Sequence, residues 1–436
     1  MTDAAADYWR DFAGWAVSDF NLPHAANHRI AAAFIDTSAC CLAGFSAEVF
    51  SAARRLGEDP SGRAFALAVA GHAFDFDDYD VPSIGHPSVV MVPVCLALAG
   101  ASHGISDLFR AYAVGVEAMA RLGEMVNPAH YEAGWHATAT LGGAGAAAAA
   151  GVMLGLNRDQ MFSALSLAVG MTGGMKAQFG SAGKPANAGF AARRGIDSAV
   201  LAQAGLDGAA ASFGHLGFAG VFQAARAVPQ TQPGAPLSIL QHGLIAKPSP
   251  CCGYLSRIVQ MLEDIRRTEA PNPGAIAKII LHVPPRNAAV IAQPIPQTPD
   301  QARFSAVYCA AVTMIHGLPV LSDFLPPALE RPEVIALAGR VQLRPLPANL
   351  SPADLSPDDP DHVEVHMTDG QILKRSEGVV PGSPACPLSR ADLRRKLDSC
   401  RALLTAETDA LADRIMAIET EADPAGFAAA LWAHQS

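Results

Sequence analysis

Apolar residues recur at helical spacing through most of the first half of the chain, from about residue 23 to residue 220. Ile30, Ala33, Phe34 and Cys41 illustrate the pattern, because residues three, four and seven positions apart lie on one face of an α-helix. Few strand-like alternations interrupt this spacing. The pattern predicts a first half made mostly of packed helices.

Local signals predict where individual helices begin and end. Asn157 and Gln160 form a capping box that opens a helix, and Gly205 is placed to end the helix that contains residues 193–204. The apolar run 141–156 consists mainly of Ala and Gly and is slightly short for a bilayer span. We therefore expect it to form a buried helix of a soluble protein.

The pattern changes after about residue 241. Apolar and polar residues alternate over 279–283 and again over 363–367, as in half-buried strands. The second run meets Thr368-Asp369-Gly370 and then continues, which predicts a β-hairpin because Gly tolerates a positive φ. Further on, Ser389 and Asp392 form a capping box at the start of C-terminal helices.

These elements predict a mainly α protein with two domains. A chain of 436 residues exceeds what one hydrophobic core usually serves. We expect a large all-helical domain formed by both chain ends, residues 1–242 and 386–436, with a smaller α/β domain inserted at 243–385.

Composition excludes several classes of protein. Half of the residues are hydrophobic and 17% are charged, which argues against disorder. The net charge of −10 argues against nucleic acid as a partner. The eight cysteines show no zinc-ligand spacing, and no basic stretch followed by an apolar run opens the chain as in a signal peptide. We expect a cytoplasmic protein that does not enter a membrane.

An acidic segment, residues 75–80, precedes Gly85-His86-Pro87-Ser88. Such a cluster of aspartates is more often a solvated loop that caps the next helix. Aspartate-rich segments of all-α proteins can also hold Mg²⁺ for diphosphate chemistry, but that use needs a second ligand cluster and a basic phosphate pocket. Neither is evident, and no metal is expected.

His136 immediately precedes the Ala/Gly-rich run. At a helix N-terminus it would lie beside backbone N–H groups that suit an anion, although an isolated histidine is more often partly buried and hydrogen-bonded. Residues 142–145 resemble part of a dinucleotide fingerprint. No clear strand precedes them and no acidic residue follows at the expected spacing, so a nicotinamide cofactor is rejected.

Two lysines are candidates for holding a carboxylate. Lys184 stands in a Gly-rich segment that is no P-loop because Pro185 follows it, and an exposed loop lysine is the alternative. Lys247 falls at the predicted domain boundary, where small-molecule clefts commonly form. Nearby Cys252 is more readily a small buried residue than a nucleophile. Tyr308 is ordinarily a core residue with a satisfied hydroxyl.

Five motifs in this order resemble those of the MmgE/PrpD family, which includes 2-methylcitrate dehydratases, cis-aconitate decarboxylases and an iminodisuccinate epimerase. They are DFDD at 75–78, GHPS at 85–88, GWHxTxT at 134–140, GKPxxAGxAAR at 183–193 and KPxPCCGY at 247–254. The resemblance spans nearly the whole chain. It implies a homodimer in which an α/β lid caps a large helical domain, with the active site between them and no cofactor.

The resemblance also implies roles for individual residues. Those implied to be catalytic are His86, His136, Lys184, Tyr131 and Asp75, and those implied to bind substrate are Lys247, Tyr308, Cys252, Asn187 and Tyr79. Two positions depart from the common pattern, because many members carry histidine where this chain has Asn187 and Ser256.

The leading hypothesis is a cofactor-independent lyase that dehydrates or decarboxylates a small di- or tricarboxylate by proton transfer beside a carboxylate. The nearest alternative is an epimerase with Tyr131 and Lys184 as opposed proton donors. A Mg²⁺-dependent all-α synthase and a non-catalytic carboxylate-binding protein remain minor alternatives.

Overall fold

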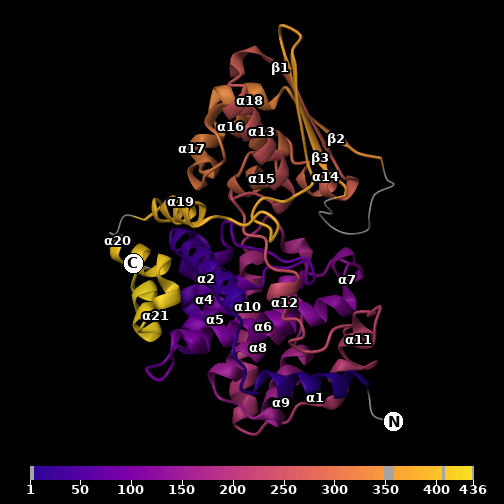
Figure 1. Ribbon diagram of the computed structural model, residues 1–436, viewed down its shortest axis with the longest axis vertical. Helices are drawn as coiled ribbons and strands as arrows, with labels where there is room; N and C mark the ends of the chain where they lie inside the picture. Colours follow the sequence, from indigo (N-terminus) through magenta and orange to yellow (C-terminus); the bar gives the residue numbers. More distant parts are fainter. Residues whose placement is uncertain (1–3, 348–357, 405–407, 435–436) are drawn as a thin grey trace. The chain divides into compact units, whose positions relative to one another are not determined.

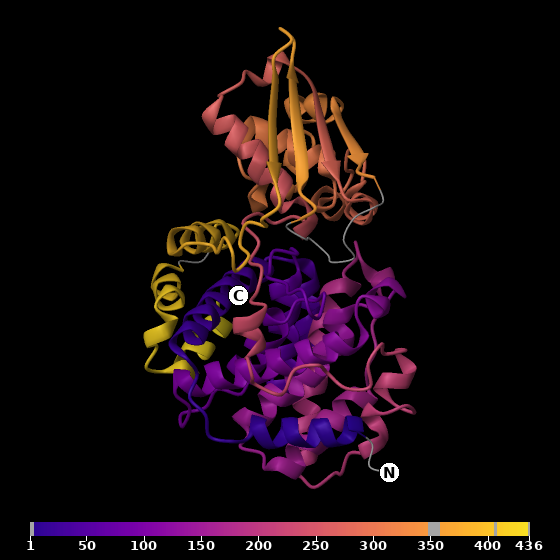
Figure 2. The same cartoon turned by 45° about the vertical axis from the view of Figure 1, so that its right-hand side comes forward.

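The computed structural model describes residues 4–347, 358–404 and 408–434, and it is mainly helical with one four-stranded sheet among these residues. The chain divides into two compact units (Figures 1 and 2). The larger unit comprises residues 1–73, 77–244 and 400–436, and the smaller unit comprises residues 74–76 and 245–399. The predicted fold class, mainly α with a small α/β part, is confirmed.

Among its described residues, the larger unit contains helices and no strand. Its α-helices are α1 (Ala4–Ala16), α2 (His24–Gly44), α3 (Glu48–Ala53), α4 (Pro60–His72), α5 (Ser88–Ala97), α6 (Ile105–Val126), α7 (Ala129–Glu132), α8 (Ala137–Met153), α9 (Arg158–Gly170), α10 (Gly183–Gln203), α11 (Phe218–Val221), α12 (Ser238–Gln241), α20 (Asp409–Met416) and α21 (Pro424–Ala433).

Helix α8 lies at the centre of this unit and packs against α5, α6, α9 and α10. It is buried along almost its whole length, and glycines allow its neighbours to approach closely. A Cβ on Gly145 would overlap the Met91 side chain and the Gly115 carbonyl, and one on Gly195 would overlap Ala146. The predicted buried helix is confirmed, and the glycines at 142–145 serve helix packing within it.

In the described part of the chain, no single helix is long and apolar enough to cross a membrane. Only α2 taken together with residues Glu48–Leu56, which are bent away from it by 91°, reaches the required length and composition.

The smaller unit contains the sheet, whose strand order is β2-β1-β3-β4. Strand β1 runs parallel to β2 and antiparallel to β3, and β3 pairs with β4 as a hairpin across Gly370, which has a φ of 92°. The strands are β1 (Ile276–Val283), β2 (Val341–Pro345), β3 (Asp361–Met367) and β4 (Ile372–Glu377). The predicted strands and hairpin are confirmed, whereas β2 had no clear alternation to reveal it.

Helices cover one face of this sheet (Figure 2). The side chains of Ile279, Leu281, Val363 and Val365 are fully buried on that face, against α13 and α16. The helices of the unit are α13 (Ser256–Thr268), α14 (Pro285–Ile291), α15 (Pro299–Arg303), α16 (Ala306–His316), α17 (Pro326–Leu329), α18 (Pro332–Ala338) and most of α19 (Arg390–Arg401).

Helix boundaries follow the predicted caps. Asn157 and Gln160 exchange hydrogen bonds at the start of α9, and Ser389 and Asp392 do so at the start of α19. Gly205, with a φ of 94°, follows the end of α10.

The division into units differs from the predicted domain boundaries in three places, and the smallest is that residues 243–244 belong to the larger unit. Residues 386–399 and the short segment 74–76 belong to the smaller unit, not to the helical one. The leucine spacing of α19 predicts a helix but does not identify the element that its buried face contacts. In the structure, Lys396 of this helix donates hydrogen bonds to the carbonyls of Phe76 and Lys247, which lie in the smaller unit.

Candidate active site

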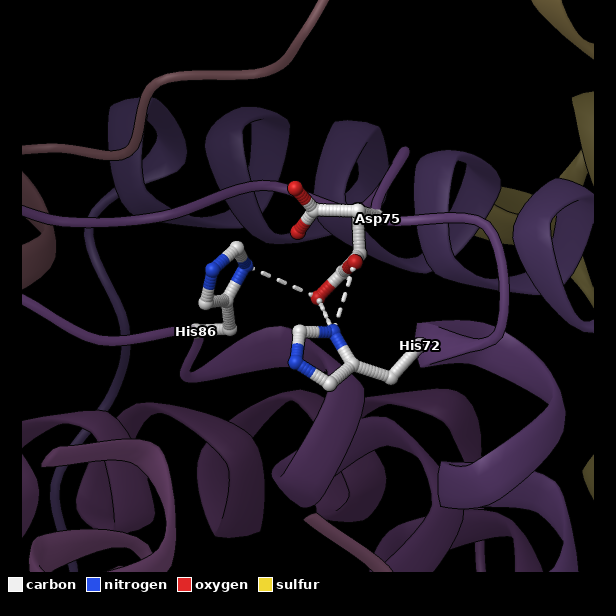
Figure 3. A group of neighbouring side chains, drawn as sticks. His72, Asp75 and His86 are labelled. Atoms are coloured by element: carbon white, nitrogen blue, oxygen red, sulfur yellow. Dashed lines mark hydrogen bonds and ion pairs between the residues drawn. The ribbon is translucent and has the colours of Figure 1, made fainter. Parts of the chain in front are cut away.

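Two histidines of the larger unit meet at one buried carboxylate. His72 ends α4, and its Nδ1 lies 2.9 Å from each carboxylate oxygen of Asp77. Nδ1 of His86 lies 3.0 Å from the same carboxylate. The rings of His72 and His86 lie close together (Figure 3), and their centroids are 4.6 Å apart. Sequence motifs singled out His86, but not His72 or Asp77 as its partners.

Asp77 is completely buried and negatively charged. Burial raises the pKa of its carboxyl group, but the charges and hydrogen bonds of His72 and His86 outweigh burial and hold that pKa well below its usual value. A carboxylate can only accept, so Nδ1 of His72 donates to it, and Nδ1 of His86 faces the same carboxylate in an ion pair. Each ring therefore keeps Nε2 for other contacts, and Nε2 of His72 has no hydrogen-bond partner among the described residues.

His136 lies beside this pair as the N-cap residue of α8, as predicted. Its backbone N–H donates to the carbonyl of Gly174, and its ring stacks at 6.1 Å from the ring of His72. Two residues further on, the Thr138 hydroxyl accepts the backbone N–H of His86. The start of α8 therefore positions both predicted histidines.

Lys184 occupies the first turn of α10 and is only 7% exposed, so the alternative of an exposed loop lysine is wrong. The helix begins at Gly183, inside the Gly-rich segment that was expected to be a loop before it. One turn further along α10, Nδ2 of Asn187 lies 3.2 Å from Nδ1 of His136. Phe179 packs edge-on against His136, and Lys184 Nζ lies 5.2 Å from the Phe179 ring. Lys184 and Asn187 thus lie beside His72, His86 and His136, which together with Asp77 are called the histidine cluster.

Tyr131 and Tyr79 have different surroundings. The Tyr131 ring lies 3.8 Å from Lys176 Nζ, which also donates to the Tyr131 carbonyl. Burial lowers the pKa of Lys176, an effect that Glu132 opposes. Lys176 is a candidate proton donor that no motif or spacing in the sequence indicated. The Tyr79 ring lies 6.3 Å from that of His86.

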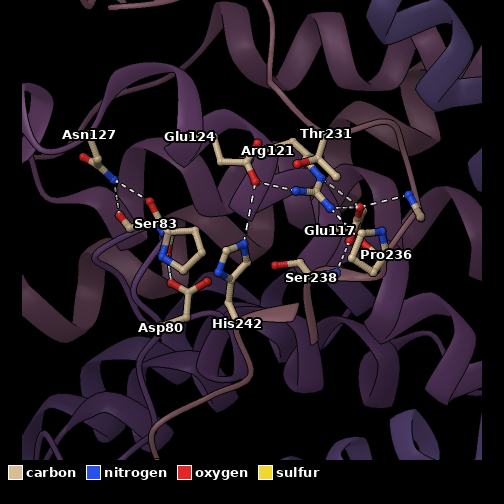
Figure 4. Close-up of polar contacts among 12 residues, drawn as sticks. Asp80, Ser83, Glu117, Arg121, Glu124, Asn127, Thr231, Pro236, Ser238 and His242 are labelled. Carbon is tan, nitrogen blue, oxygen red and sulfur yellow. Dashed lines mark hydrogen bonds and ion pairs between the residues drawn. The ribbon is translucent and has the colours of Figure 1, made fainter. Parts of the chain in front are cut away.

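A polar network fixes the loop that carries His86 (Figure 4). Asn127, just after α6, donates to the carbonyls of Pro82 and Ser83, at 3.1 and 2.6 Å. Both the hydroxyl and the backbone N–H of Ser83 donate to Asp80. Burial raises the pKa of Asp80 to about 6, against the hydrogen bonds from Ser83 and the charge of His242. The acidic segment is therefore structured and buried, not a solvated loop.

The smaller unit holds a second cluster of predicted residues. Lys247 Nζ forms an ion pair with Asp75 at 3.1 Å and donates to the Asp75 carbonyl at 2.6 Å. Asp75 has a φ of 52°, a strained value for a residue other than glycine. Burial and the negative charge of Asp75 raise the pKa of the Cys252 thiol to about 12, although Lys247 opposes them. A thiol of this kind is no nucleophile at neutral pH.

Two further buried cations in this cluster, Arg303 and Lys396, were not predicted. Arg303 is 4% exposed, lies 5.0 Å from the Phe74 ring and accepts the Cys252 N–H on its carbonyl. Lys396 is 3% exposed. For Lys396 the available signal was its helical spacing from Leu393 and Cys400, whereas the short helix α15 offered no such signal for Arg303.

Tyr308 is placed in the core of the smaller unit. It is fully buried, and its hydroxyl donates to the carbonyl of Asp323 at 2.5 Å. This is the core position that is ordinary for such a residue, and its implied role in substrate binding stays a prediction.

The structure thus gathers the predicted residues into two groups. His86, His136, Lys184 and Asn187 lie together in the larger unit, and Asp75, Lys247 and Cys252 lie together in the smaller unit.

A metal ion could be held by His86 of the first group together with His72 and Asp77. His72, Asp77 and His86 each offer a ligand atom, and these atoms lie within 4.8 Å of one another. Metal ligation by both Nδ1 atoms requires each of them to be without a proton. The same three residues can therefore bind a metal ion or form a proton-transfer network, and activity measured with and without a chelator distinguishes the two.

Comparison with known proteins identifies the family. The MmgE/PrpD N-terminal domain matches residues 56–230 and the MmgE/PrpD C-terminal domain matches residues 249–422. The chain therefore belongs to the MmgE/PrpD family.

Its relatives include cis-aconitate decarboxylases. The human protein is 30% identical over 353 residues, which cover 77% of this chain and 72% of the human one. The mouse protein is 28% identical over 354 residues, covering 77% and 71% of the two chains. The Aspergillus terreus protein is 30% identical over 308 residues, covering 63% and 62%. These relatives support an MmgE/PrpD-type lyase.

Proposed function

We propose that this protein is a lyase that decarboxylates a small unsaturated di- or tricarboxylate of the cis-aconitate type. The observation that carries the proposal is the buried Asp77 carboxylate, which is bonded to two imidazoles beside His136. The names of the relatives support the substrate class and the reaction.

Decarboxylation defines what the site must supply. The C–C bond to one carboxylate breaks, CO₂ leaves, and the electron pair remains on the carbon skeleton. One proton must then reach carbon, so the net reaction consumes one proton. The site needs a proton donor that operates near neutral pH and cations that stabilise the developing negative charge.

The residues of the larger unit suit these tasks. His86 and His136 are candidate proton donors, because imidazole exchanges protons near neutral pH. Asp77 orients the His86 ring through Nδ1 and favours its charged form, leaving Nε2 as the donor atom. Lys184, buried in the first turn of α10, would stabilise a carboxylate or carbanion charge.

Proton NMR of the purified protein in D₂O tests the proposal, with cis-aconitate, 2-methylcitrate, citrate and iminodisuccinate offered separately. Decarboxylation predicts new vinyl signals and one equivalent of CO₂ from cis-aconitate. Conversion of 2-methylcitrate to an alkene without CO₂ would instead favour a dehydratase. Deuterium entering an α-position without a new product would favour the epimerase and overturn the decarboxylase.

Two additions sharpen this experiment. Parallel reactions with EDTA separate proton chemistry from metal chemistry at His72, Asp77 and His86, because loss of activity with the chelator would contradict a cofactor-independent reaction. Tyr131→Phe and Lys184→Met test the epimerase, which requires both donors. Racemisation that survives either change would exclude that version.

We also propose a homodimer. Several large apolar side chains of the larger unit are exposed, among them Leu216 (87%), Val221 (64%) and Phe190 (52%). Light scattering coupled to size exclusion should give twice the mass of the chain, and a monomer at micromolar concentration would contradict the proposal.

A further inference from the structure

Segment 74–76 contacts three buried cations of the smaller unit. The pairs are Phe74 with Arg303, Asp75 with Lys247, and Phe76 with Lys396. Lys247 belongs to a family motif. Lys396 does not, and it stands about 150 residues further along the chain.

Lys396 is held by backbone acceptors on both sides of the Asp75–Lys247 ion pair. Its Nζ donates to the carbonyl of Phe76 at 2.5 Å and to the carbonyl of Lys247 at 3.3 Å. It also lies 4.0 Å from the Phe76 ring. A buried ammonium is costly unless it is hydrogen-bonded, and two carbonyls with an aromatic face provide such a setting.

The backbone that Lys396 binds needs such support. Asp75 adopts a φ of 52°, and strained residues persist only where their surroundings fix them. Lys247 Nζ holds the Asp75 carbonyl, and Lys396 Nζ holds the next carbonyl along the chain. The two ammonium groups thus fix consecutive peptide units.

We propose that Lys396 is a positioning residue that fixes the backbone on both sides of the Asp75–Lys247 pair and so holds the Lys247 ammonium in place. That the ammonium then binds a substrate carboxylate rests on the proposed function. The positioning itself rests on the geometry alone.

Hydrogen–deuterium exchange tests the positioning without any turnover. In Lys396→Met, the backbone amides of residues 74–78 and 245–250 should exchange about tenfold faster, because two carbonyl acceptors lose their donor. Lys374→Met is the matched control: Lys374 is an exposed lysine of the same unit, paired with Glu364 at 2.6 Å. Unchanged exchange in Lys396→Met, or an equal change in the control, would overturn the inference.

Kinetics test the consequence for the substrate. Lys396→Met should raise KM for the polycarboxylate about tenfold with kcat within about threefold, because a displaced Lys247 weakens substrate binding. Lys396→Arg, which restores a buried cation and donors, should recover at least part of the loss. A fall in kcat alone, with KM unchanged, would contradict this role.

These measurements separate the two proposals. If the wild-type protein converts none of the polycarboxylates, the proposed function fails, while exchange still decides the role of Lys396. If Lys396→Met does not fold, Lys396→Leu, which also removes every donor but keeps an apolar side chain, takes its place in the exchange experiment. Local exchange in Lys396→Leu equal to wild type would then overturn the inference.

Discussion

The two clusters of candidate residues are built from different chemistry. In the larger unit, imidazoles share a buried carboxylate, so the groups there can gain and lose protons near neutral pH. In the smaller unit, Lys247, Arg303 and Lys396 present fixed positive charges around the strained segment 74–76. The same set of family motifs runs through both units, yet only one cluster is suited to proton transfer.

This contrast predicts a division of kinetic effects. Changes in the histidine cluster should lower kcat, because they remove proton transfer in the transition state. Changes in the cation cluster, formed by Lys247, Arg303 and Lys396, should raise KM. They weaken binding of a carboxylate in the ground state and the transition state alike. These kinetic effects rest on the proposed decarboxylation.

The largest effect is expected at His86. His86→Ala should lower kcat by about 10³-fold with little change in KM, since a positioned acid or base contributes roughly 10²- to 10⁴-fold. Release of CO₂ gives both constants. His28→Gln is the control, because His28 is exposed and pairs with Glu419 away from this cluster. A variant that keeps full kcat would remove His86 from the reaction.

Asp77→Asn should have the next largest effect. The change keeps the shape of the side chain but removes the charge that holds both imidazoles, and kcat should fall about 10²-fold. The alkaline limb of the pH–rate profile should also move to lower pH, because the proton donor must be charged and His86 loses the carboxylate that favours its charged form. An unchanged profile would show that Asp77 has only a structural role.

The fold could be predicted from the sequence further than the site could. Helical spacing, two capping boxes and the hairpin at Gly370 are local signals, and each is found in the structure. No local signal in the sequence predicts that residues 74–76 and most of α19 belong to the smaller unit. This membership depends on long-range contacts such as Lys396 with Phe76, which no spacing in the sequence reveals.

Within the site, motif positions singled out His86, His136 and Lys184, and in the structure they contact Thr138, Asn187 and Phe179 of the same region. The motifs did not identify His72, which lies at the end of an apolar helix and looks like a core residue in sequence. The hydrogen-bond partner of His72, Asp77, follows only five residues later. A loop brings the two side chains together, so helical spacing in the sequence could not predict their contact.

Lys247→Met should raise KM more than it lowers kcat, by about 10- to 100-fold, if the cation cluster binds a carboxylate. The change also removes the partner of Asp75, so the double variant with Asp75→Asn is needed. If the rise in KM of the single variant is caused mainly by the Asp75 carboxylate left without its cation, the double variant should have a KM closer to that of the wild type. A fall in kcat equal to that of His86→Ala would contradict the assignment of substrate binding to the cations and proton transfer to the histidines.

The smallest effect concerns stability and involves the smaller unit alone. Burial raises the pKa of Asp361 from its usual range to about 7, although Arg257 opposes it. A raised carboxyl pKa means that the folded state binds the proton more tightly than the unfolded state. The free energy of unfolding therefore falls as pH rises from about 4 to about 7, and the full penalty remains above that range.

Asp361→Asn removes this penalty but also removes the carboxylate that faces Arg257, so the net gain should be about 2 kcal/mol at pH 8. At pH 4.5 the gain should vanish, because Asp361 is then protonated in the folded state. Urea unfolding at both pH values measures the difference. The exposed Asp264→Asn in the same unit should change neither value. A variant less stable than wild type at pH 8 would show that pairing with Arg257 outweighs the cost of burying the Asp361 charge, which would contradict the raised pKa.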